Sequence, residues 1–590
     1  MTTNDNLPHW NLSLLYEADS PELARDTGET LALTERFLRW RDKARRGDVT
    51  KEEFRLMLDE YVRIREREIR LSSYAGLAFA QDTQDQKILS FQGKLEEILA
   101  EVGNKTLFFV FFWQSLEDDE SERLSEGLPA HRHWLKRLRT NKPHTLSEPE
   151  ERIISLKDIT GRDAVTTLYD TITGRYKFRS HFDPSRKGKE LSREELSVYF
   201  RSPDPKTREE AYKEFYRVYG GDGPLIAQIF QAISRDWRIE NVNLRGYPHP
   251  QAARNNRNDL PGEVVESLLS VSKSEAPRIF GAYFKKKREL LKLETFRRYD
   301  LYAPYSGADE EEVPFDAALN LVKEAFSELS PDLAKLAMSV NESEHLSARL
   351  LPNKRSGAFC CSVLPEDCPW VLMSYKGRRQ DVFTLAHELG HASHSLLAKD
   401  KGVMEFEATL PLAETASTFG EMLLAKKYLD GSAGVDGGRD VLFHVLDDAY
   451  ATVGRQAFFA LFEIEAHDMV FRGATADELS RAYLKNLETQ FGDSMTVGGE
   501  FAWEWTCIPH FFQSPFYVYA YTFGQLLVYS LWNVFEKEGK AFAPKLIRIL
   551  SLGSSASPAD ILASAGVGPL NDEFWAGGYG VIERFLNALS

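Results

Sequence analysis

The sequence predicts a mainly α-helical protein with two or more lobes and one small β element. Its 590 residues are more than a single hydrophobic core usually organises, so at least two lobes are expected. Apolar residues recur every three or four positions over long stretches, with charged residues between them, as in residues 54–64. Strand-like segments are short and confined to one region of the chain.

The helical spacing begins near Pro21 and continues to about Phe112, and it returns in several later segments. Ser557 followed by Pro558 has the pattern of a helix N-cap with proline at the first helical position. A polar, turn-rich stretch at residues 180–195 suggests a division into an N-terminal helical lobe, 1–190, and a second domain, 191–590. Further helices are predicted at residues 192–200, 206–218, 260–293, 315–329 and 441–470.

Two segments, residues 358–363 and 370–375, are β-prone and flank a loop that contains Pro365 and Pro369. This arrangement predicts a hairpin. The strand at 371–375 is predicted to keep one free edge, along which an extended peptide can pair main chain to main chain. This strand is expected to border a peptide-binding cleft, and residues 357–361 are expected to line the same cleft.

The composition excludes several classes of partner. A net charge of −16 argues against nucleic acid, whose binding requires a basic face, and against an anionic membrane surface. The most apolar stretch, residues 107–113, is too short to span a bilayer, and no secretory signal is visible at the N-terminus. Four cysteines follow no zinc-finger or disulfide spacing, which favours free thiols in a reducing cytoplasm. We therefore expect a cytoplasmic protein.

The strongest chemical signal is the pattern His-Glu-x-x-His at His387, Glu388 and His391. Residues four apart on a helix lie on one face, so two imidazoles can reach one ion at about 2.0–2.1 Å each. Glu388 projects beside such an ion and is placed to take a proton from a metal-bound water. The apolar residues around the motif favour a buried helix.

A catalytic zinc usually has three protein ligands and one open position. His394 is a tempting third ligand, but it lies seven residues after His387, about 10 Å along a straight helix. We therefore expect His394 to lie outside the first coordination shell. Glu414 is the better candidate, on a second helix packed through small residues against the first. Glu421, seven residues later, is expected to accept a hydrogen bond from a ligand imidazole.

An aromatic cluster follows near the C-terminus. His510 precedes three alternating tyrosines, Tyr517, Tyr519 and Tyr521. Peptide hydrolysis creates a negatively charged oxygen, which a phenol or imidazole donor can stabilise. A buried aromatic patch with no chemical role is the alternative interpretation of these residues.

Several stretches in the right order resemble oligoendopeptidase F, of the thimet-oligopeptidase-like zinc metallopeptidases. Besides the motif at 384–391, one stretch has the pattern Glu-x-x-Ser-x-Phe-x-Glu at residues 414–421. Together the stretches cover most of the chain, which is far more specific than the His-Glu-x-x-His pattern alone. The others are residues 10–16, 299–304, 355–360, 371–375, 455–459 and 508–511.

The resemblance implies two helical lobes around a deep substrate channel, with a metal on its wall and a small β-sheet nearby. It implies that Glu414 is the third ligand and that the enzyme cleaves internal bonds of short peptides. It also gives His510 and the tyrosines a role in holding substrate and transition state. Among the tyrosines, Tyr519 is the first choice, followed by Tyr517 and Tyr521.

The sequence therefore predicts a zinc-dependent oligopeptidase with one zinc ion per chain, in which Glu388 activates a zinc-bound water. Two rival functions remain: a non-catalytic peptide-binding protein with the same fold, and an exopeptidase. Cobalt or manganese in place of zinc also remains open, because such ligands tolerate several divalent metals. The oligomeric state is not predicted.

Overall fold

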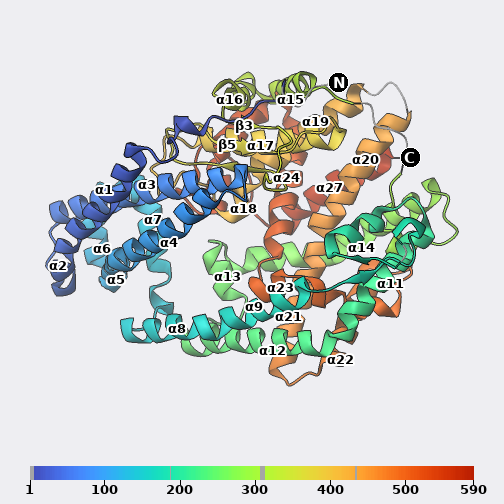
Figure 1. The fold of residues 1–590 in the computed structure, drawn as a ribbon, viewed down its shortest axis with the longest axis horizontal. Helices are drawn as coiled ribbons and strands as arrows, with labels where there is room; N and C mark the ends of the chain where they lie inside the picture. The colour runs from blue at the N-terminus through green and yellow to red at the C-terminus, as the bar shows by residue number, and fades with distance from the viewer. Residues whose placement is uncertain (1–5, 187, 306–311, 432–434, 590) are drawn as a thin grey trace. The chain divides into compact units, whose positions relative to one another are not determined.

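The computed structural model describes residues 6–186, 188–305, 312–431 and 435–589 (Figure 1). It is mainly α-helical with two small sheets, which confirms the predicted fold class. By packing, the chain forms two compact units, each assembled from three segments. Unit 1 contains Met1–Lys142, Glu310–Asp430 and Phe535–Val567, and unit 2 contains Pro143–Asp309, Gly431–Val534 and Gly568–Ser590.

The predicted division into residues 1–190 and 191–590 does not follow these packing units. Residue 190 lies inside the first segment of unit 2, and the chain passes between the units five times. Each unit is therefore completed by residues that are far apart in the sequence.

The N-terminal part of unit 1 is a layer of helices in which α1 and α4 pack along α3 (Figure 1). A capping box between Thr50 and Glu53 begins α3, because each side chain accepts from the other's backbone N–H. The apolar stretch at residues 107–113 forms most of α5. The helices of this part are α1 (Pro21–Phe37), α2 (Arg41–Arg46), α3 (Lys51–Gln81), α4 (Gln86–Thr106), α5 (Phe108–Ser115), α6 (Asp118–Ser125) and α7 (Arg132–Thr140).

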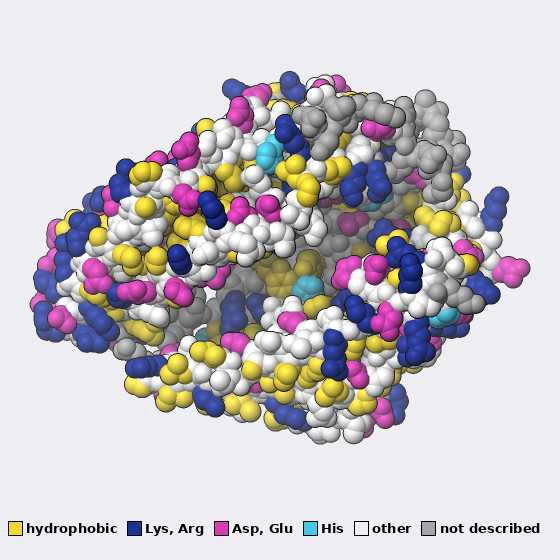
Figure 2. Space-filling view, viewed as in Figure 1, with side chains coloured by type: hydrophobic (Ala, Val, Ile, Leu, Met, Phe, Trp, Pro, Cys, Tyr) yellow, Lys and Arg dark blue, Asp and Glu magenta, His cyan; other side chains and the backbone are white. Residues whose placement is uncertain are grey.

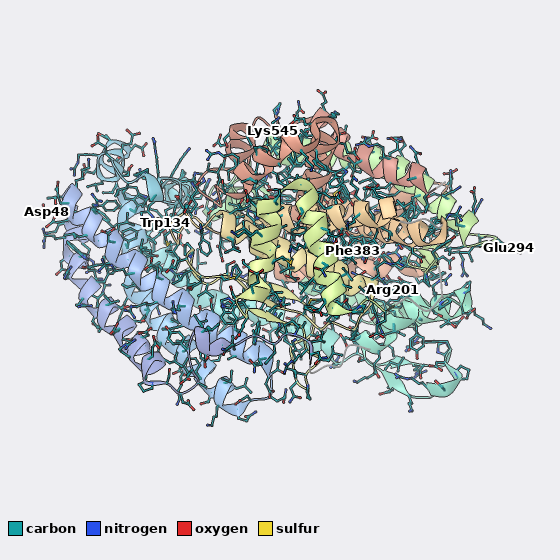
Figure 3. All side chains as sticks on the ribbon, turned by 90° about the horizontal axis from the view of Figure 1, so that it is seen from above. Asp48, Trp134, Arg201, Glu294, Phe383 and Lys545 are labelled. Carbon is teal, nitrogen blue, oxygen red and sulfur yellow. The ribbon has the colours of Figure 1, made fainter. Side chains whose placement is uncertain are left out.

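Aromatic side chains fill the core between these helices. The Phe54 ring stacks on Trp113 with ring centroids 4.9 Å apart. Trp134, labelled in Figure 3, stacks on Phe109 at 6.0 Å. Large aromatic surfaces removed from water contribute strongly to such a core.

Among the remaining elements of unit 1, α17 packs against α15, α16, α25, β4 and β5. The helix predicted at 315–329 has the bounds of α15, and Ser557 caps α26 as predicted. These elements are α15 (Phe315–Leu329), α16 (Pro331–Glu342), β3 (Leu346–Ser347), β4 (Phe359–Cys361), β5 (Trp370–Leu372), α17 (Arg379–Leu397), α18 (Leu410–Ala413), α19 (Thr415–Gly431), α25 (Ala543–Leu550) and α26 (Pro558–Ser564).

The predicted hairpin is present, because β4 pairs antiparallel with β5, with Cys360 opposite Val371. However, β5 also pairs with β3 in parallel, which gives the strand order β3-β5-β4. The prediction that the strand at 371–375 keeps a free edge is therefore wrong. Within the described sheet, the strand at the open edge beside α17 is β4.

Unit 2 is also helical, and α14 packs along α27. The helix predicted at 441–470 is interrupted by a π-helical turn, Tyr450–Gly454. The elements are α8 (Glu148–Thr160), α9 (Arg162–Gly174), β1 (Phe178–Arg179), β2 (Glu190–Leu191), α10 (Arg193–Ser197), α11 (Pro205–Gly221), α12 (Gly223–Arg238), α13 (Ala252–Arg257), α14 (Gly262–Leu290), α20 (Val435–Ala449), α21 (Arg455–Phe471), α22 (Ala476–Phe491), α23 (His510–Gln513), α24 (Tyr519–Glu538, whose last turn belongs to unit 1) and α27 (Asp572–Ala588).

Acidic and basic side chains are interspersed over the face of the molecule shown in Figure 2. None of the helices in the described ranges combines the length and the apolar character needed to cross a bilayer.

Candidate metal centre

The helix α17 carries the His-Glu-x-x-His pattern. Its first turn is fixed by Asp381, whose carboxylate accepts from the backbone N–H groups of Lys376 (2.7 Å) and Arg378 (3.1 Å). Such an acidic residue at a helix N-terminus satisfies free N–H groups and complements the helix dipole. Phe383, labelled in Figure 3, is one of the buried apolar residues that hold α17 in unit 1.

One face of α17 brings the two motif histidines together. The Nε2 atoms of His387 and His391 lie 3.2 Å apart, and both side chains remain partly exposed. This is the geometry expected for residues four apart on a helix. Both imidazoles can therefore turn a nitrogen toward one point.

Glu414 completes this group from the junction between α18 and α19. Its Oε2 atom lies 3.4 Å from Nε2 of His387 and 3.2 Å from Nε2 of His391. The Ser417 hydroxyl donates to the same carboxylate oxygen at 2.8 Å, which orients it. The three side chains thus present one ligand atom each within a single small volume.

Small residues allow α19 to lie directly against α17. A Cβ atom at Gly390 would lie 2.6 Å from Cα of Ser417 and 2.7 Å from the carbonyl oxygen of Ala416. A Cβ at Gly420 would lie 3.2 Å from the carbonyl oxygen of Ala386. The close helix packing predicted from the small residues around Glu414 is therefore confirmed.

Glu421 lies seven residues after Glu414, in α19, and its carboxylate orients the His387 ring. Nδ1 of His387 lies 2.6 Å from Oε1 of Glu421. Burial lowers the pKa of His387, but the hydrogen bond and charge of Glu421, together with the charges of Glu414 and Glu388, raise it to about 9. Because an ionised carboxylate only accepts, Nδ1 carries the proton and the lone pair of Nε2 faces His391 and Glu414 in the neutral ring.

Glu388 lies beside this group with its side chain largely buried. Among the described residues, no hydrogen-bond partner reaches its Oε2 atom. Burial raises the pKa of Glu388; the nearby imidazoles oppose this rise, and the charges of Glu414 and Glu421 add to it. Such an unpaired carboxylate with a raised pKa is suited to accept and release a proton.

His394 lies apart from this group. It is buried near the end of α17, and its burial lowers its pKa to about 4, so the ring is neutral at pH 7. The three-residue group that can hold a metal consists of His387, His391 and Glu414 and does not include it. This placement agrees with the expectation from helix geometry.

The donor set fits a divalent transition metal. Two imidazole nitrogens and one carboxylate oxygen converge, and the second nitrogen of one imidazole is fixed by Glu421. Burial raises the pKa of Glu414 and the hydrogen bond to His391 lowers it, and the net result is a pKa of about 2. This carboxylate is thus ionised at neutral pH. Glu414 is therefore ready to bind a metal, whereas the raised pKa of His387 means that metal binding releases a proton from this ring.

A cavity of about 420 Å³ opens over the metal centre within unit 1. Ala358, Phe359 and Cys360 form one wall, which confirms that residues of the 357–361 stretch border the site. Because β4 is the edge strand, the main-chain groups available at this wall belong to β4 rather than β5. The remaining lining residues are Ser362, His387, Glu388, His391, His394, Ser395, Phe406, Glu407, Ala408, Ala413 and Glu414.

The aromatic residues predicted near the C-terminus belong to unit 2. Nε2 of His510 lies 3.1 Å from the Tyr521 hydroxyl, and the His510 ring stacks on Tyr517 at 5.7 Å. Tyr519 is fully buried, and its hydroxyl accepts from Nδ2 of Asn258 at 2.8 Å. The structure therefore groups His510 with Tyr517 and Tyr521 and separates Tyr519, the first choice from the sequence.

The contacts of two residues at the centre were not predicted from the sequence. Ser417 lies three residues after Glu414, a spacing at which a hydroxyl commonly bonds back along a helix, so it could have been found. Glu407 lines the cavity but lies in a loop, where no periodicity indicates the direction of a side chain.

The chain matches the model of Peptidase family M3 over residues 198–581 and that of Oligopeptidase F over residues 113–178. Oligopeptidase PepF of Bacillus subtilis (strain 168) is 26% identical over 513 residues, which cover 86% of this chain and 76% of that protein. An Oligoendopeptidase F homolog of Borreliella burgdorferi is 24% identical over 95% of this chain and 93% of its own.

Solved structures share the fold. One from Chlamydophila abortus aligns with a TM-score of 0.87 at 23% identity, covering 98% of this chain and 97% of that one. Oligoendopeptidase-F from Enterococcus faecium aligns with a TM-score of 0.71, also at 23% identity, over 95% and 97%.

The helical fold and the His-Glu-x-x-His centre with a carboxylate as third donor define a metallopeptidase of the mainly α class. The chain belongs to peptidase family M3. The predicted resemblance to oligoendopeptidase F and the predicted enzyme class, a metalloendopeptidase, are thereby confirmed.

Proposed function

We propose that this peptidase is a zinc-dependent endopeptidase that hydrolyses internal bonds of short peptides. The observation that carries the proposal is the convergence of His387, His391 and Glu414 in one cavity, with the unpaired carboxylate of Glu388 beside them. Relatives named Oligopeptidase PepF and Oligoendopeptidase F support oligopeptides as the substrate class. Two imidazoles and a carboxylate with an open fourth position are the usual ligands of a catalytic zinc.

Zinc held by His387, His391 and Glu414 would supply Lewis acidity, which lowers the pKa of water and polarises a peptide carbonyl. Glu388 then takes the proton of the attacking water on its free Oε2 atom and delivers it to the leaving amine. The raised pKa of Glu388 favours the first transfer, because a more basic carboxylate takes up a proton more readily.

We propose β4 as the strand that binds the peptide backbone. Its open edge borders the cavity, and main-chain pairing binds many sequences with little preference. For the phenol donor we propose Tyr521, with Tyr517 next. The support is that both remain partly exposed beside His510, whereas the Tyr519 hydroxyl is engaged by Asn258.

The test is product mapping by mass spectrometry on peptides of graded length, with both termini blocked. We expect internal cleavage of the shorter peptides, loss of cleavage after chelation, and recovery with one equivalent of zinc per chain. Cleavage that requires a free terminus would indicate an exopeptidase. A failure to cleave any peptide with the metal bound would favour the non-catalytic peptide-binding alternative.

Replacing Glu421 with alanine is expected to weaken metal binding about 10- to 100-fold, because the His387 ring loses the partner that fixes its tautomer and orientation. Competition with a fluorescent zinc chelator measures this change. Glu421→Gln is the matched control: its amide oxygen still accepts from Nδ1, so most of the affinity should return. Equal affinity of the alanine variant and the parent would contradict an orienting role.

A further inference from the structure

We propose that Glu407 makes the metal cavity select peptides that present a cationic group, an ammonium or a guanidinium, next to the scissile bond. This inference rests on the proposed function, since it concerns how that site chooses its substrate. Glu407 lies seven residues before Glu414 and lines the same cavity. Its role would be to bind substrate, with no part in the proton transfers.

The backbone around Glu407 is firmly held. The carbonyl oxygen of Gly402 accepts from the N–H groups of Glu405 (2.8 Å) and Phe406 (3.0 Å), which closes a turn. The Phe406 side chain is buried in a core cluster that includes Trp10 and Trp370. With this neighbour directed into the core, the Glu407 side chain remains exposed at the cavity wall.

Glu405, two residues before Glu407, also holds this segment in place. Its side chain is buried and accepts from the Trp134 backbone N–H at 2.8 Å, and its carbonyl oxygen accepts from the Ser554 N–H at 2.8 Å. A Cβ at Gly553 would lie 2.3 Å from that carbonyl oxygen, so the two backbones are in direct contact. Glu407 therefore projects from a rigid wall, and such preorganisation favours binding.

The other carboxylates of the centre have partners or a chemical role. Glu414 contacts both histidines and Ser417, Glu421 contacts His387, and Glu388 is the proposed base. The Glu407 carboxylate has no hydrogen-bond or ion-pair partner among the described residues. The surrounding protein atoms partly remove this carboxyl from water and so raise its pKa.

The charge balance of the cavity favours a cation. Its lining includes the three carboxylates of Glu388, Glu407 and Glu414, with Glu421 behind them, and no lysine or arginine among its described lining residues. One divalent metal offsets two of these four negative charges. A substrate cation offsets a third, and a carboxylate in a partly desolvated wall binds an ammonium or guanidinium by charge-assisted hydrogen bonds.

Two parts of a peptide supply such a cation: a lysine or arginine side chain, or the free amino terminus. The experiment uses zinc-loaded parent and Glu407→Gln enzymes with internally quenched peptides of one sequence. In the first arm lysine replaces norleucine at each position flanking the scissile bond. In the second arm the amino terminus is free or acetylated. Each kcat/KM is measured at low and high salt.

We expect the parent to prefer the cationic peptide of one arm by about 10- to 100-fold, the range for a charge-assisted hydrogen bond. Glu407→Gln should lose this preference, so that its ratio of kcat/KM values for the cationic and neutral peptides falls to about 1. Glu407→Asp should keep part of it, and Glu407→Lys should prefer a glutamate at that position. Salt should weaken the preference, because screening acts on a partly exposed pair. The arm that responds identifies the source of the cation.

An equal preference in the parent and in Glu407→Gln would overturn the proposal, as would a parent that cleaves cationic and neutral peptides alike. Glu126→Gln, a change of the same kind at an exposed surface carboxylate of unit 1, is the matched control. Binding of the same peptides to zinc-loaded Glu388→Gln, with and without the additional change Glu407→Gln, is measured by fluorescence polarisation and gives a second readout. If the parent cleaves no peptide but the binding preference depends on Glu407, then the proposed function fails and this inference stands.

Discussion

Glu388→Gln is expected to lower kcat/KM by about 10²- to 10⁴-fold on every peptide that the parent cleaves. General base catalysis contributes about this factor, and an amide cannot accept the proton that Oε2 of Glu388 takes. Glutamine has the same shape as glutamate, and Glu388 is not one of the three ligand residues, so the metal should remain bound. Steady-state kinetics with metal analysis of the same sample measures both quantities.

The matched control for this change is again Glu126→Gln, which should retain the parent's kcat/KM. A loss of metal together with activity in Glu388→Gln would instead mean that Glu388 helps to hold the ion. Activity within tenfold of the parent would contradict its assignment as the base.

Glu504→Gln should destabilise unit 2 by about 3–5 kcal/mol, the cost of removing one partner of a buried ion pair. Oε1 of Glu504 lies 2.6 Å from Nη2 of Arg298 and 3.4 Å from Nη2 of Arg455, and the Arg298 and Glu504 side chains are each 2% exposed. Without the carboxylate, the buried Arg298 guanidinium loses its counter-charge, and Arg455, whose side chain is 27% exposed, loses one partner. Urea unfolding followed by tryptophan fluorescence measures the change.

The control for this prediction is Glu22→Gln in the exposed pair of Glu22 with Arg25, where both side chains are about 60% exposed. Exposed ion pairs contribute about 0–1 kcal/mol to the free energy of unfolding, so this variant should have the same urea midpoint as the parent. The double variant Arg298→Met with Glu504→Leu should recover part of the loss, because replacing a buried pair by apolar side chains is often neutral. A Glu504→Gln variant as stable as the parent would mean that water reaches the pair.

The sequence predicted the parts of the site that depend on local geometry. His387 and His391 lie on one face because any helix brings residues four apart together. Gly420 and Ser417 indicated close packing of α19, because only small residues let two helix backbones approach. The helix at residues 315–329 was predicted with the bounds of α15, because its apolar residues recur at helical spacing.

Long-range pairings could not be predicted in the same way. The strand β3 has only two residues, too few to show any alternation, yet its pairing places β5 in the middle of the sheet. The tyrosines at 517, 519 and 521 alternate like a strand, but Tyr519 begins the helix α24 and turns into the core. The direction of a side chain at a helix start depends on tertiary contacts that the sequence pattern does not contain.

The interleaving of the two units has a consequence for how the protein is made. The N-terminal helices of unit 1 end at Thr140, but the residues that complete their core include Phe406, which follows 266 residues later. At translation rates of about 5–20 residues per second, these helices wait roughly ten seconds to one minute for that segment. During this time their apolar faces lack part of their final cover, so the nascent chain is exposed to aggregation until that segment has been made.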